Sequence, residues 1–530
     1  MKPEGCCRHA AGVVGVLGML LLSVLHVPAA AQIEKKGGGP AVAVGNTTAP
    51  GPLKLTLAET VLMCIENNRA LMVERLNPSI RETFESQERA AFDPTVAVEG
   101  SAGRIEGERL ARAGSETEDF TVNAVEGVIS LDHYFPTGTR VALEAGTRMD
   151  DSSLYQDSFY ATRLGLSVTQ ALLKGRGTGA NLARLRQARL DTRMSEYELR
   201  GFTEFLVAEA ERTYWDYALA RRRIEIVEES LKVARQQLDE TEALISVGRL
   251  ARAELAAVQA EVAAQEQALI EAKANKESIR LQLLRLIDPP GAGIWSRELD
   301  LAHQPTLPEV KLEDVALHVA VAKRMRPILN EARLGVLRGD LEVVKTRNGM
   351  LPLLDLFVTL GKSGYAGSFG ESVANLDEDR YDAMAGIRFA YPVGNRGARA
   401  AHRRAQLSRE QEQKALENLA QLVEVDVRTA YIDVDRTHQQ IAASSVTRRF
   451  DEEKLRTETE KLRVGKSTSF LVAQAQRDLL VSRIAEVQAL ANYLKALIDL
   501  YRLDGSLLVR RGIEAPGSDP VEIFPAVQGK

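Results

Sequence analysis

The longest regular pattern in the chain is an apolar stripe at helical spacing between Gly179 and Ile287. In its first arm the apolar and small residues recur in alternating steps of three and four, which is typical of a coiled-coil seam. At 1.5 Å per residue, the roughly 67 residues before Gly248 would form a rod about 100 Å long. A turn at residues 246–249 and a second helical pattern up to Ile287 predict a long helical hairpin. The seam consists of Leu206, Ala210, Thr213, Tyr217, Ala220, Ile224, Val227, Leu231, Ala234, Leu238, Thr241 and Ile245.

The same pattern returns 217 residues later, where Tyr431 matches Tyr214 and Val464-Gly465 match Val247-Gly248. Self-similarity over this length indicates an internal duplication. Each copy opens with a shorter helical pattern, from Leu57 to about Phe92 and from Leu312 to about Asn348. The sequence therefore predicts two copies of one unit, each with a shorter helix followed by a long hairpin.

Between the shorter helix and the hairpin, the apolar period changes to two, which predicts strands. The first copy has such segments at 95–98, 128–131, 140–145 and 163–170, with a tight turn expected at 136–139, and the second copy has them at 353–360 and 383–391. Because the second copy is about 40 residues shorter here, we expect an extra hairpin or loop in the first copy only. The sequence leaves open how the segments at 105–150 fold.

These patterns predict a mainly α fold with β-strands and a chain of successive parts. They are a signal peptide (1–31), a flexible lead-in (32–52), repeat 1 (53–287), a linker (288–309), repeat 2 (310–503) and a C-terminal tail (504–530). The prolines of the tail predict a loose segment.

The N-terminus is typical of a secretory signal. Lys2 and Arg8 precede an apolar run from Ala10 to Leu25, and small residues follow up to Ala31, after which we expect cleavage. The alternative is a membrane anchor, but the run is shorter than the ~20 residues that a spanning helix needs. No later stretch has the sequence of a spanning helix, so a membrane-embedded form would require a closed β-barrel, since lipid satisfies no backbone hydrogen bond.

Composition narrows the class of protein further. Hydrophobic residues make up 45% and charged residues 27%, with a net charge of −5 and basic residues interleaved with acidic ones, which argues against nucleic-acid binding. The seven histidines show no metal-ligand spacing and no catalytic arrangement, so we expect neither an enzyme nor a cofactor or metal. Residues 175–180 are rich in glycine, as in the motif that binds dinucleotides. That motif belongs to a short strand–helix–strand unit, and the helix that follows residue 180 is far too long for such a unit.

The sequence motifs that are most specific to one family occur in a fixed order, and some of them occur twice. They are residues 166–177, Tyr214-Trp215, Val247-Gly248 with Gln259-Ala260, and Val464-Gly465 with Gln474-Ala475. In these motifs the chain, from about residue 53 to 503, resembles the TolC-like outer-membrane efflux protein family. The resemblance implies duplicated hairpins that form an α-barrel and strands that contribute to a trimeric transmembrane β-barrel in outer-membrane lipid, with a long periplasmic extension.

The function implied by the resemblance is a passive export conduit in a tripartite efflux or type I secretion system. A homotrimer would work with a periplasmic adaptor protein and an inner-membrane pump of the RND or ABC type. The residues alone leave an alternative, an exported periplasmic coiled-coil scaffold protein without a pore.

The resemblance also places two candidate sites. It implies an adaptor-docking tip at Val247, Gly248, Arg249, Val464, Gly465 and Lys466. The alternative is that the basic residues at these turns form only a solvated charge cluster. The resemblance implies a pore constriction just after the turns, at Glu254, Leu471 and Gln474. The family's best-known form has acidic residues after both turns, whereas here only Glu254 is acidic.

Overall fold

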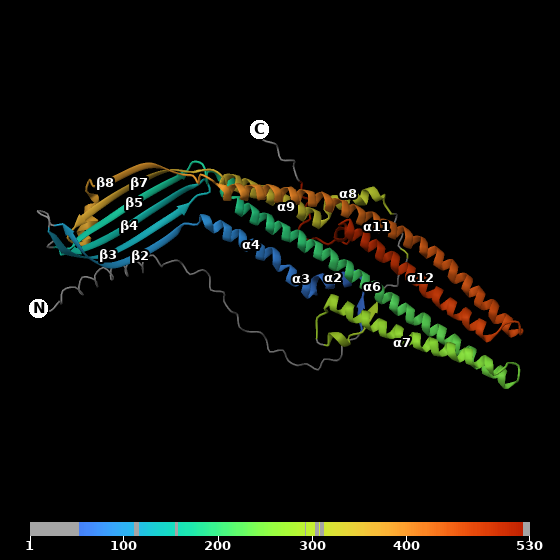
Figure 1. Cartoon of the computed structure of the whole chain (residues 1–530). Helices are drawn as coiled ribbons and strands as arrows, with labels where there is room; N and C mark the ends of the chain where they lie inside the picture. The colour runs from blue at the N-terminus through green and yellow to red at the C-terminus, as the bar shows by residue number, and fades with distance from the viewer. Residues whose placement is uncertain are drawn as a thin grey trace. The chain divides into compact units, whose positions relative to one another are not determined.

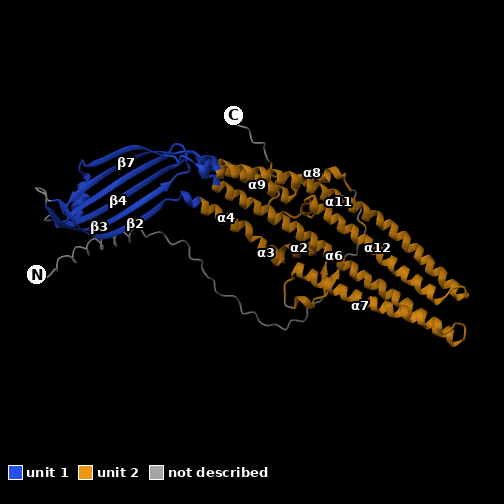
Figure 2. Cartoon of the chain, viewed as in Figure 1, with its two compact units in different colours: residues 1–48, 89–183, 345–399 blue, residues 49–88, 184–344, 400–530 orange. Residues whose placement is uncertain are grey.

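The structure is a computed structural model that describes residues 52–110, 116–153, 157–291, 293–302, 307 and 312–522. The predicted signal peptide and nearly all of the lead-in lie outside these residues. The chain divides into two compact units, which Figure 2 colours separately. Unit 1 contains residues 89–183 and 345–399, and unit 2 contains 184–344 and 400–530 together with 49–88. Both units therefore draw on both halves of the chain.

Unit 2 is built on the two predicted hairpins, α6–α7 and α11–α12 (Figure 1). Its helices are α2 (Leu57–Asn67), α3 (Arg69–Glu74), α4 (Leu76–Arg89), α6 (Ala183–Ser246), α7 (Ala253–Ile287), α8 (Val315–Met325), α9 (Pro327–Gly349), α11 (Arg396–Arg463), α12 (Ser469–Leu503) and α13 (Leu507–Arg510). The long arms α6 and α11 contain 64 and 68 residues. Within the described part of the chain, every helix falls short of the length or the apolarity that crossing a lipid bilayer requires.

The two shorter helices are interrupted, although the helical pattern of the sequence continues through both breaks. At Asn68 the backbone is extended, and the side-chain oxygen accepts hydrogen bonds from the amides of Ala70 and Leu71 at 3.0 and 3.1 Å, starting a new helix. Arg326 is also extended because it precedes Pro327, whose ring disfavours helical geometry in the preceding residue. The prediction of one uninterrupted helix in each copy is therefore wrong.

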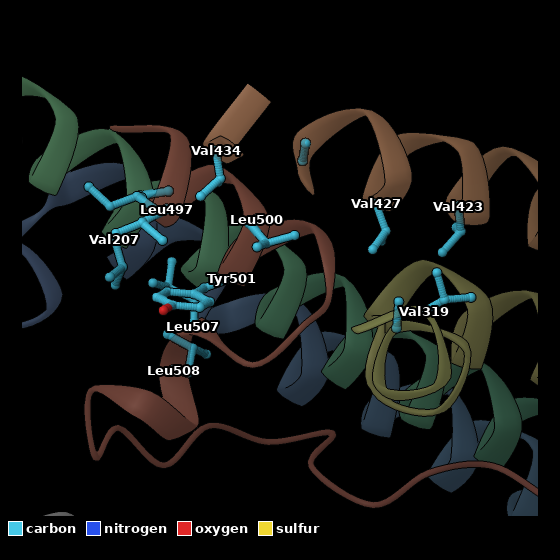
Figure 3. Close-up of a cluster of buried hydrophobic side chains, with 14 of the residues drawn as sticks. Val207, Val319, Val423, Val427, Val434, Leu497, Leu500, Tyr501, Leu507 and Leu508 are labelled. Carbon is cyan, nitrogen blue, oxygen red and sulfur yellow. The ribbon is translucent and has the colours of Figure 1, made fainter. Parts of the chain in front are cut away.

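The predicted seam forms the core of unit 2. Leu206, Ala210, Tyr217, Val227 and Ala234 are all buried along α6. One cluster, shown in Figure 3, joins α6 and α8 to α11, α12 and α13 through Val207, Val319, Val423, Val427, Val434, Leu497, Leu500, Tyr501, Leu507 and Leu508. Each such side chain contributes about 1.5–3 kcal/mol when removed from water.

A second cluster of unit 2 is closed by a small parallel sheet of β1 (Leu53–Leu55) and β6 (Leu299–Leu301). The hydroxyl of Tyr217 donates a hydrogen bond to the Leu299 carbonyl at 3.1 Å. Part of the predicted linker is thus a strand that ties the end of the first hairpin to the start of the first copy.

The C-terminal segment is packed as far as it is described. Leu507 and Leu508 are fully buried, and the amide of Val521 donates to the Asn330 side chain at 2.9 Å. The hydroxyl of Tyr197 donates to the Asp519 carbonyl. The expectation of a loose tail is therefore wrong for residues 504–522, because apolar residues before and after Pro516 are buried.

Unit 1 is a six-stranded antiparallel sheet in the described residues, called the large sheet below. Its order is β2 (Thr95–Leu110), β3 (Thr117–Tyr134), β4 (Thr139–Ser152), β5 (Phe159–Ala171), β7 (Leu353–Ala366) and β8 (Tyr381–Ala390). The turn predicted at 136–139 is present, with Gly138 at φ +89° and its amide bonded to the Phe135 carbonyl. Of the six strands in the large sheet, four come from the first copy and two from the second, so the extra hairpin lies in the first copy only, as predicted.

Unit 1 also contains four short elements: α5 (Thr178–Asn181), α10 (Phe369–Ala374) and two 3₁₀ turns, at Ala90–Phe92 and Asn375–Asp377. The α10 segment connects β7 to β8 and packs on β5 and β7. Gly175 and Gly177 adopt positive φ values of 86° and 83° between β5 and α5. These glycines serve the strand-to-helix transition, where a side chain would strain the backbone.

Candidate functional site

The large sheet has one apolar face and one polar face. Its register aligns Val96, Leu131, Leu143, Leu166, Leu360 and Ala383 in one row across the strands. The five large members of this row are all between 37% and 55% exposed. On β4 the alternating side chains of this face run from Val141 to Met149, and Thr139 and Asp151 bound them. Such a band of about nine residues matches the 9–11 residues of a tilted membrane-spanning strand.

The opposite face carries charged and hydroxyl side chains. The row next to the apolar one contains Ser130, Glu144 and Asp382. Arg163 on β5 reaches over Gly361 to Asp382 on β8 at 2.7 Å, and a side chain at Gly361 would collide with both. Alternation of this kind gives a sheet that contacts an apolar medium on one side and water on the other.

The two hairpin turns are built alike. Gly248 and Gly465 have φ values of +74° and +73°. The amides that follow them, at Arg249 and Lys466, bond back to the carbonyls of Leu244 and Lys461 at 2.9 and 2.8 Å, which is the Schellman pattern of helix ends. Val247 and Val464 are 68% and 67% exposed, so each turn presents an apolar side chain to its surroundings.

Basic side chains surround these turns. Arg249, Arg252 and Lys466 are exposed. Lys461 and Arg463 are also exposed but pair with Glu458 and Glu460 on their own helix at 2.7 and 2.9 Å. Within the described residues, Arg249 and Lys466 make no ion pair, which leaves their charges available to a binding partner.

The three residues predicted at the constriction do not have equivalent surroundings. The carboxylate of Glu254, in the first turn of α7, accepts a hydrogen bond from the Ser469 amide at the start of α12, at 2.9 Å. A carboxylate at a helix N-terminus satisfies a free amide and interacts favourably with the helix dipole. Leu471 is 43% exposed and Gln474 is also exposed on α12. Glu254 therefore joins the two hairpins in addition to any role in a pore.

Glu261 makes a stronger link between the hairpins, and it was not among the residues predicted from the sequence. This side chain is buried between α7 and α12, where it accepts hydrogen bonds from Arg477 and Gln265, both at 2.7 Å. Glu261 and Arg477 occupy nearly equivalent positions in the two copies, since α7 begins at Ala253 and α12 at Ser469. Opposite charges at matched positions of a duplication were the signal that would have found them.

Farther from the turns, α12 is bonded to α6. Lys495 pairs with Asp216 at 2.7 Å, and Arg212 pairs with Asp499. Arg483 reaches both Glu229 on α6 and Glu452 on α11, at 3.4 and 3.3 Å. The two hairpins of one chain are thus connected by charged contacts along much of their length.

Among the described residues there is no cluster of three or more His, Cys, Asp or Glu side chains arranged to hold a metal ion. The candidate surfaces of this protein are therefore the two faces of the large sheet and the two hairpin turns.

Comparison with known proteins agrees with this architecture. Residues 320–506 match the model of a family described as outer membrane efflux protein. No curated protein matches the chain.

Solved structures match along most of the chain, at low sequence identity. The Campylobacter jejuni CmeC outer membrane channel has a TM-score of 0.63 at 15% identity, with 85% of this chain and 86% of that chain covered. The open state of the Neisseria gonorrhoeae MtrE outer membrane channel gives 0.58 at 18%, with 85% and 89% covered. The outer membrane protein VceC of Vibrio cholerae gives 0.60 at 14%, with 85% and 96% covered. The fold predicted from the sequence is therefore confirmed.

Proposed function

We propose that this chain, whose residues 320–506 belong to the outer membrane efflux protein family, is the outer-membrane channel subunit of a tripartite efflux or type I secretion system. The observation that carries the proposal is the large sheet, apolar and exposed on one face and polar on the other, in one chain with two long helical hairpins. Solutes would pass along the polar face without chemical change.

The physics of the sheet supports an oligomer, which we propose to be a homotrimer as in the family that the sequence resembles. Lipid offers no hydrogen bonds, so the open edge of a sheet in a membrane costs several kcal/mol for each unpaired backbone group. Further copies of the chain supply the missing edges. The protein would then lie in the outer membrane, with its hairpins extending into the periplasm.

The two hairpin turns are the proposed docking tip for a periplasmic adaptor, which would connect the channel to an inner-membrane pump of the RND or ABC type. The exposed Val247 and Val464 supply apolar contacts, and the unpaired Arg249 and Lys466 supply positive charge. A partner surface with apolar pockets and acidic side chains fits this tip.

The narrowest part of the conduit is proposed to lie just beyond the turns, at Glu254, Leu471 and Gln474. Three copies of Glu254 would place carboxylates around an opening, and such a ring favours cations. Because Glu254 also bonds Ser469, its removal is expected to loosen this end of the hairpins.

The test of the channel function is membrane insertion followed by electrical recording. The mature protein is expected in the outer-membrane fraction as a heat-modifiable trimer, and it should produce discrete conductance steps in a planar bilayer. A scaffold without a pore would remain in the soluble fraction and conduct no current, and that result would reject the proposal.

Docking at the tip is tested by charge reversal. We expect the double variant Arg249→Glu/Lys466→Glu to lose export in cells while its bilayer conductance stays near that of the wild type. Lys414→Glu, which reverses an exposed charge away from the turns on α11, is the matched control and should export normally. Unchanged export by the double variant would reject the docking role.

The constriction is tested by Glu254→Ala, which should lower cation selectivity and raise conductance. Glu271→Ala removes an exposed carboxylate farther along the same helix and should change neither quantity. Equal cation selectivity in the two variants would show that the constriction does not lie at Glu254.

A further inference from the structure

The polar face of the large sheet also carries large apolar side chains, which gather on β7 and β8. Met384 of β8 lies on this face and is 61% exposed. Phe357 of β7 is directly opposite Gly386, and its ring covers this glycine so closely that a side chain there would come within 2.5 Å of it. An exposed apolar patch in a polar surround is typical of a surface that binds a ligand.

A free positive charge lies beside this patch. Arg388 is on the same face, two residues beyond Gly386, and its guanidinium carbon is 5.8 Å from the centre of the Phe357 ring. The side chain is exposed. Within the described residues it forms no ion pair, not even with Asp355, which is directly opposite on β7. Its charge is therefore available to a solute.

The same combination of an aromatic ring and a guanidinium recurs eight residues farther along β7. Tyr365 stacks on Phe159 of β5, with the ring centres 5.6 Å apart, and the two side chains are 39% and 47% exposed. The guanidinium carbon of Arg380 is 5.9 Å from the Tyr365 ring. We call Phe357, Met384 and Arg388 the first group, and Phe159, Tyr365 and Arg380 the second group.

The charges of the polar face differ between its two sides. On β2 and β4, the exposed Glu99 and Glu144 form no ion pair within the described residues, whereas on β8 the free charge is that of Arg388. Between the two groups, β7 presents Thr359, Gly361 and Ser363 to this face, and none of these is acidic. An anionic solute is therefore attracted to the β7–β8 side of the face and repelled from the β2–β4 side.

We propose that this side of the polar face binds solutes that combine an aromatic ring with a carboxylate, at the first group and again at the second. The inference rests on the proposed function, because solutes reach this face by passing through the channel. At the first group, the solute ring packs on Phe357 and on the flexible thioether of Met384, which adapts to rings of different shape. The solute carboxylate accepts hydrogen bonds from the planar guanidinium of Arg388.

Binding at such an open surface is weak, which suits a conduit. A solute of about nine heavy atoms is expected to bind with a Kd on the order of 10 mM. Passage requires binding strong enough to gather the solute and weak enough to release it. The cation preference proposed at Glu254 concerns small ions at the constriction and involves none of these residues.

A cysteine reporter tests the binding. Thr359→Cys is directly opposite Met384 on β7 and retains all members of both groups. In the full-length mature protein, about 20 mM benzoate should slow labelling of this cysteine by methyl methanethiosulfonate about twofold or more. Cyclohexanecarboxylate has the same charge without an aromatic ring, and benzylammonium has the ring with the opposite charge. Neither should change the rate appreciably, and equal protection by all three solutes would overturn the inference.

Substitutions in the Thr359→Cys background locate the contact. Arg388→Gln and Phe357→Leu should each abolish the protection by benzoate. Phe389→Leu is the matched control, because Phe389 is an exposed aromatic residue of the same strand on the apolar face, and it should keep the protection. Protection that persists in both Arg388→Gln and Phe357→Leu would show that benzoate does not bind at the first group.

The second group is tested in the same way with Ser363→Cys, which lies beside Tyr365 on β7. Benzoate should slow its labelling, and Tyr365→Leu should remove this effect while Arg388→Gln leaves it in place. Protection of Ser363→Cys that does not depend on Tyr365 would remove the second group from the binding surface.

Planar-bilayer recording of the same preparations separates this inference from the channel function. Preparations that conduct, but in which benzoate protects neither reporter, would overturn the binding surface and leave the channel function standing. Protection that follows the expected pattern in a protein that conducts no current would reject the channel function and leave the binding surface standing.

Discussion

The carboxylate of Glu261, only 1% exposed, accepts a hydrogen bond from the guanidinium of Arg477 at 2.7 Å and so joins α7 to α12. The two residues are 216 positions apart in a duplicated chain. A buried carboxylate is costly unless it is paired, so this contact holds the two hairpins together near their turns.

Arg477→Ala should therefore weaken the connection between the hairpins. It leaves Glu261 buried with Gln265 as its remaining described partner, and we expect the free energy of unfolding to fall by about 1–3 kcal/mol. This loss of unfolding free energy is smaller than that expected for breaking a fully buried ion pair, because the Arg477 side chain is 44% exposed. Looser hairpins should also raise the single-channel conductance.

Thermal unfolding of the detergent-solubilised protein and planar-bilayer recording measure the two effects. Arg456→Ala removes an exposed ion pair with Glu453 on α11 and should change stability by no more than about 0.5 kcal/mol. If Arg477→Ala behaves like Arg456→Ala in both measurements, the Glu261 contact does not restrain the hairpins.

Cys64 should be unreactive in the folded protein. It is fully buried on α2, and burial raises the pKa of its thiol to about 12. At pH 8 only a fraction on the order of 10⁻⁴ is ionised, and the thiolate is the reactive form. We expect maleimide labelling of the mature protein to be at least about 100-fold slower than after unfolding in guanidinium.

An exposed cysteine provides the matched control for this measurement. Ser246→Cys lies at the end of α6, where the native side chain is exposed, and should be labelled rapidly in the folded protein. Rapid labelling at Cys64 under the same conditions would show that α2 opens readily.

Glu204 should make stability depend on pH. Its carboxyl is 3% exposed, and burial raises its pKa to about 7, against the smaller opposing effect of Arg200. A raised pKa means that the folded state binds a proton that the unfolded state has released. The resulting stabilisation is complete below about pH 4.5 and is lost as the pH rises through about 7, with a size on the order of 3 kcal/mol.

Glu204→Gln should flatten this part of the stability profile and stabilise the protein at pH 8. Unfolding temperatures at several pH values between 4.5 and 8 measure the effect. Glu209→Gln, at a more exposed position of the same helix, should leave the slope as in the wild type. An unchanged slope in Glu204→Gln would assign the pH dependence to other groups.

We expect the packing of α10 on β5 and β7 to require the glycine at position 364. A side chain there would collide with the backbone of Ser372, Asn375 and Leu376. Beside it, the hydroxyls of Thr162 and Ser372 are hydrogen-bonded at 2.7 Å. Gly364→Ala should therefore displace the segment between β7 and β8 and speed tryptic cleavage at Arg380 by about tenfold or more, since cleavage tracks local opening.

Gly370 offers the matched control for this substitution, because a methyl group added there meets open space. Gly370→Ala should leave the cleavage rate near that of the wild type. Slow cleavage in both variants would show that the sheet accommodates the methyl group by a small shift.

The tertiary structure corrected several predictions that relied on local pattern. The helical period continues through Asn68, yet this residue leaves the helix because its side chain caps α3 and donates to the Leu286 carbonyl 218 positions away. The prolines near the C-terminus signal a loop correctly, but they carry no information about Leu507 and Leu508 packing against distant helices. Pattern reports the local conformation, and it does not report which distant surface a segment meets.

The sequence by itself determined the duplication, the two long hairpins with their glycine turns and the strands with one apolar face, because apolar period and glycine geometry act within a few residues. It also placed Val247, Gly248, Val464 and Gly465 at the turns. Only the tertiary structure decided the order of the strands, the pairing of Glu261 with Arg477 and the bond from Ser469 to Glu254. These contacts join residues far apart in the chain, and their energies depend on burial and distance, which exist only once the chain is folded.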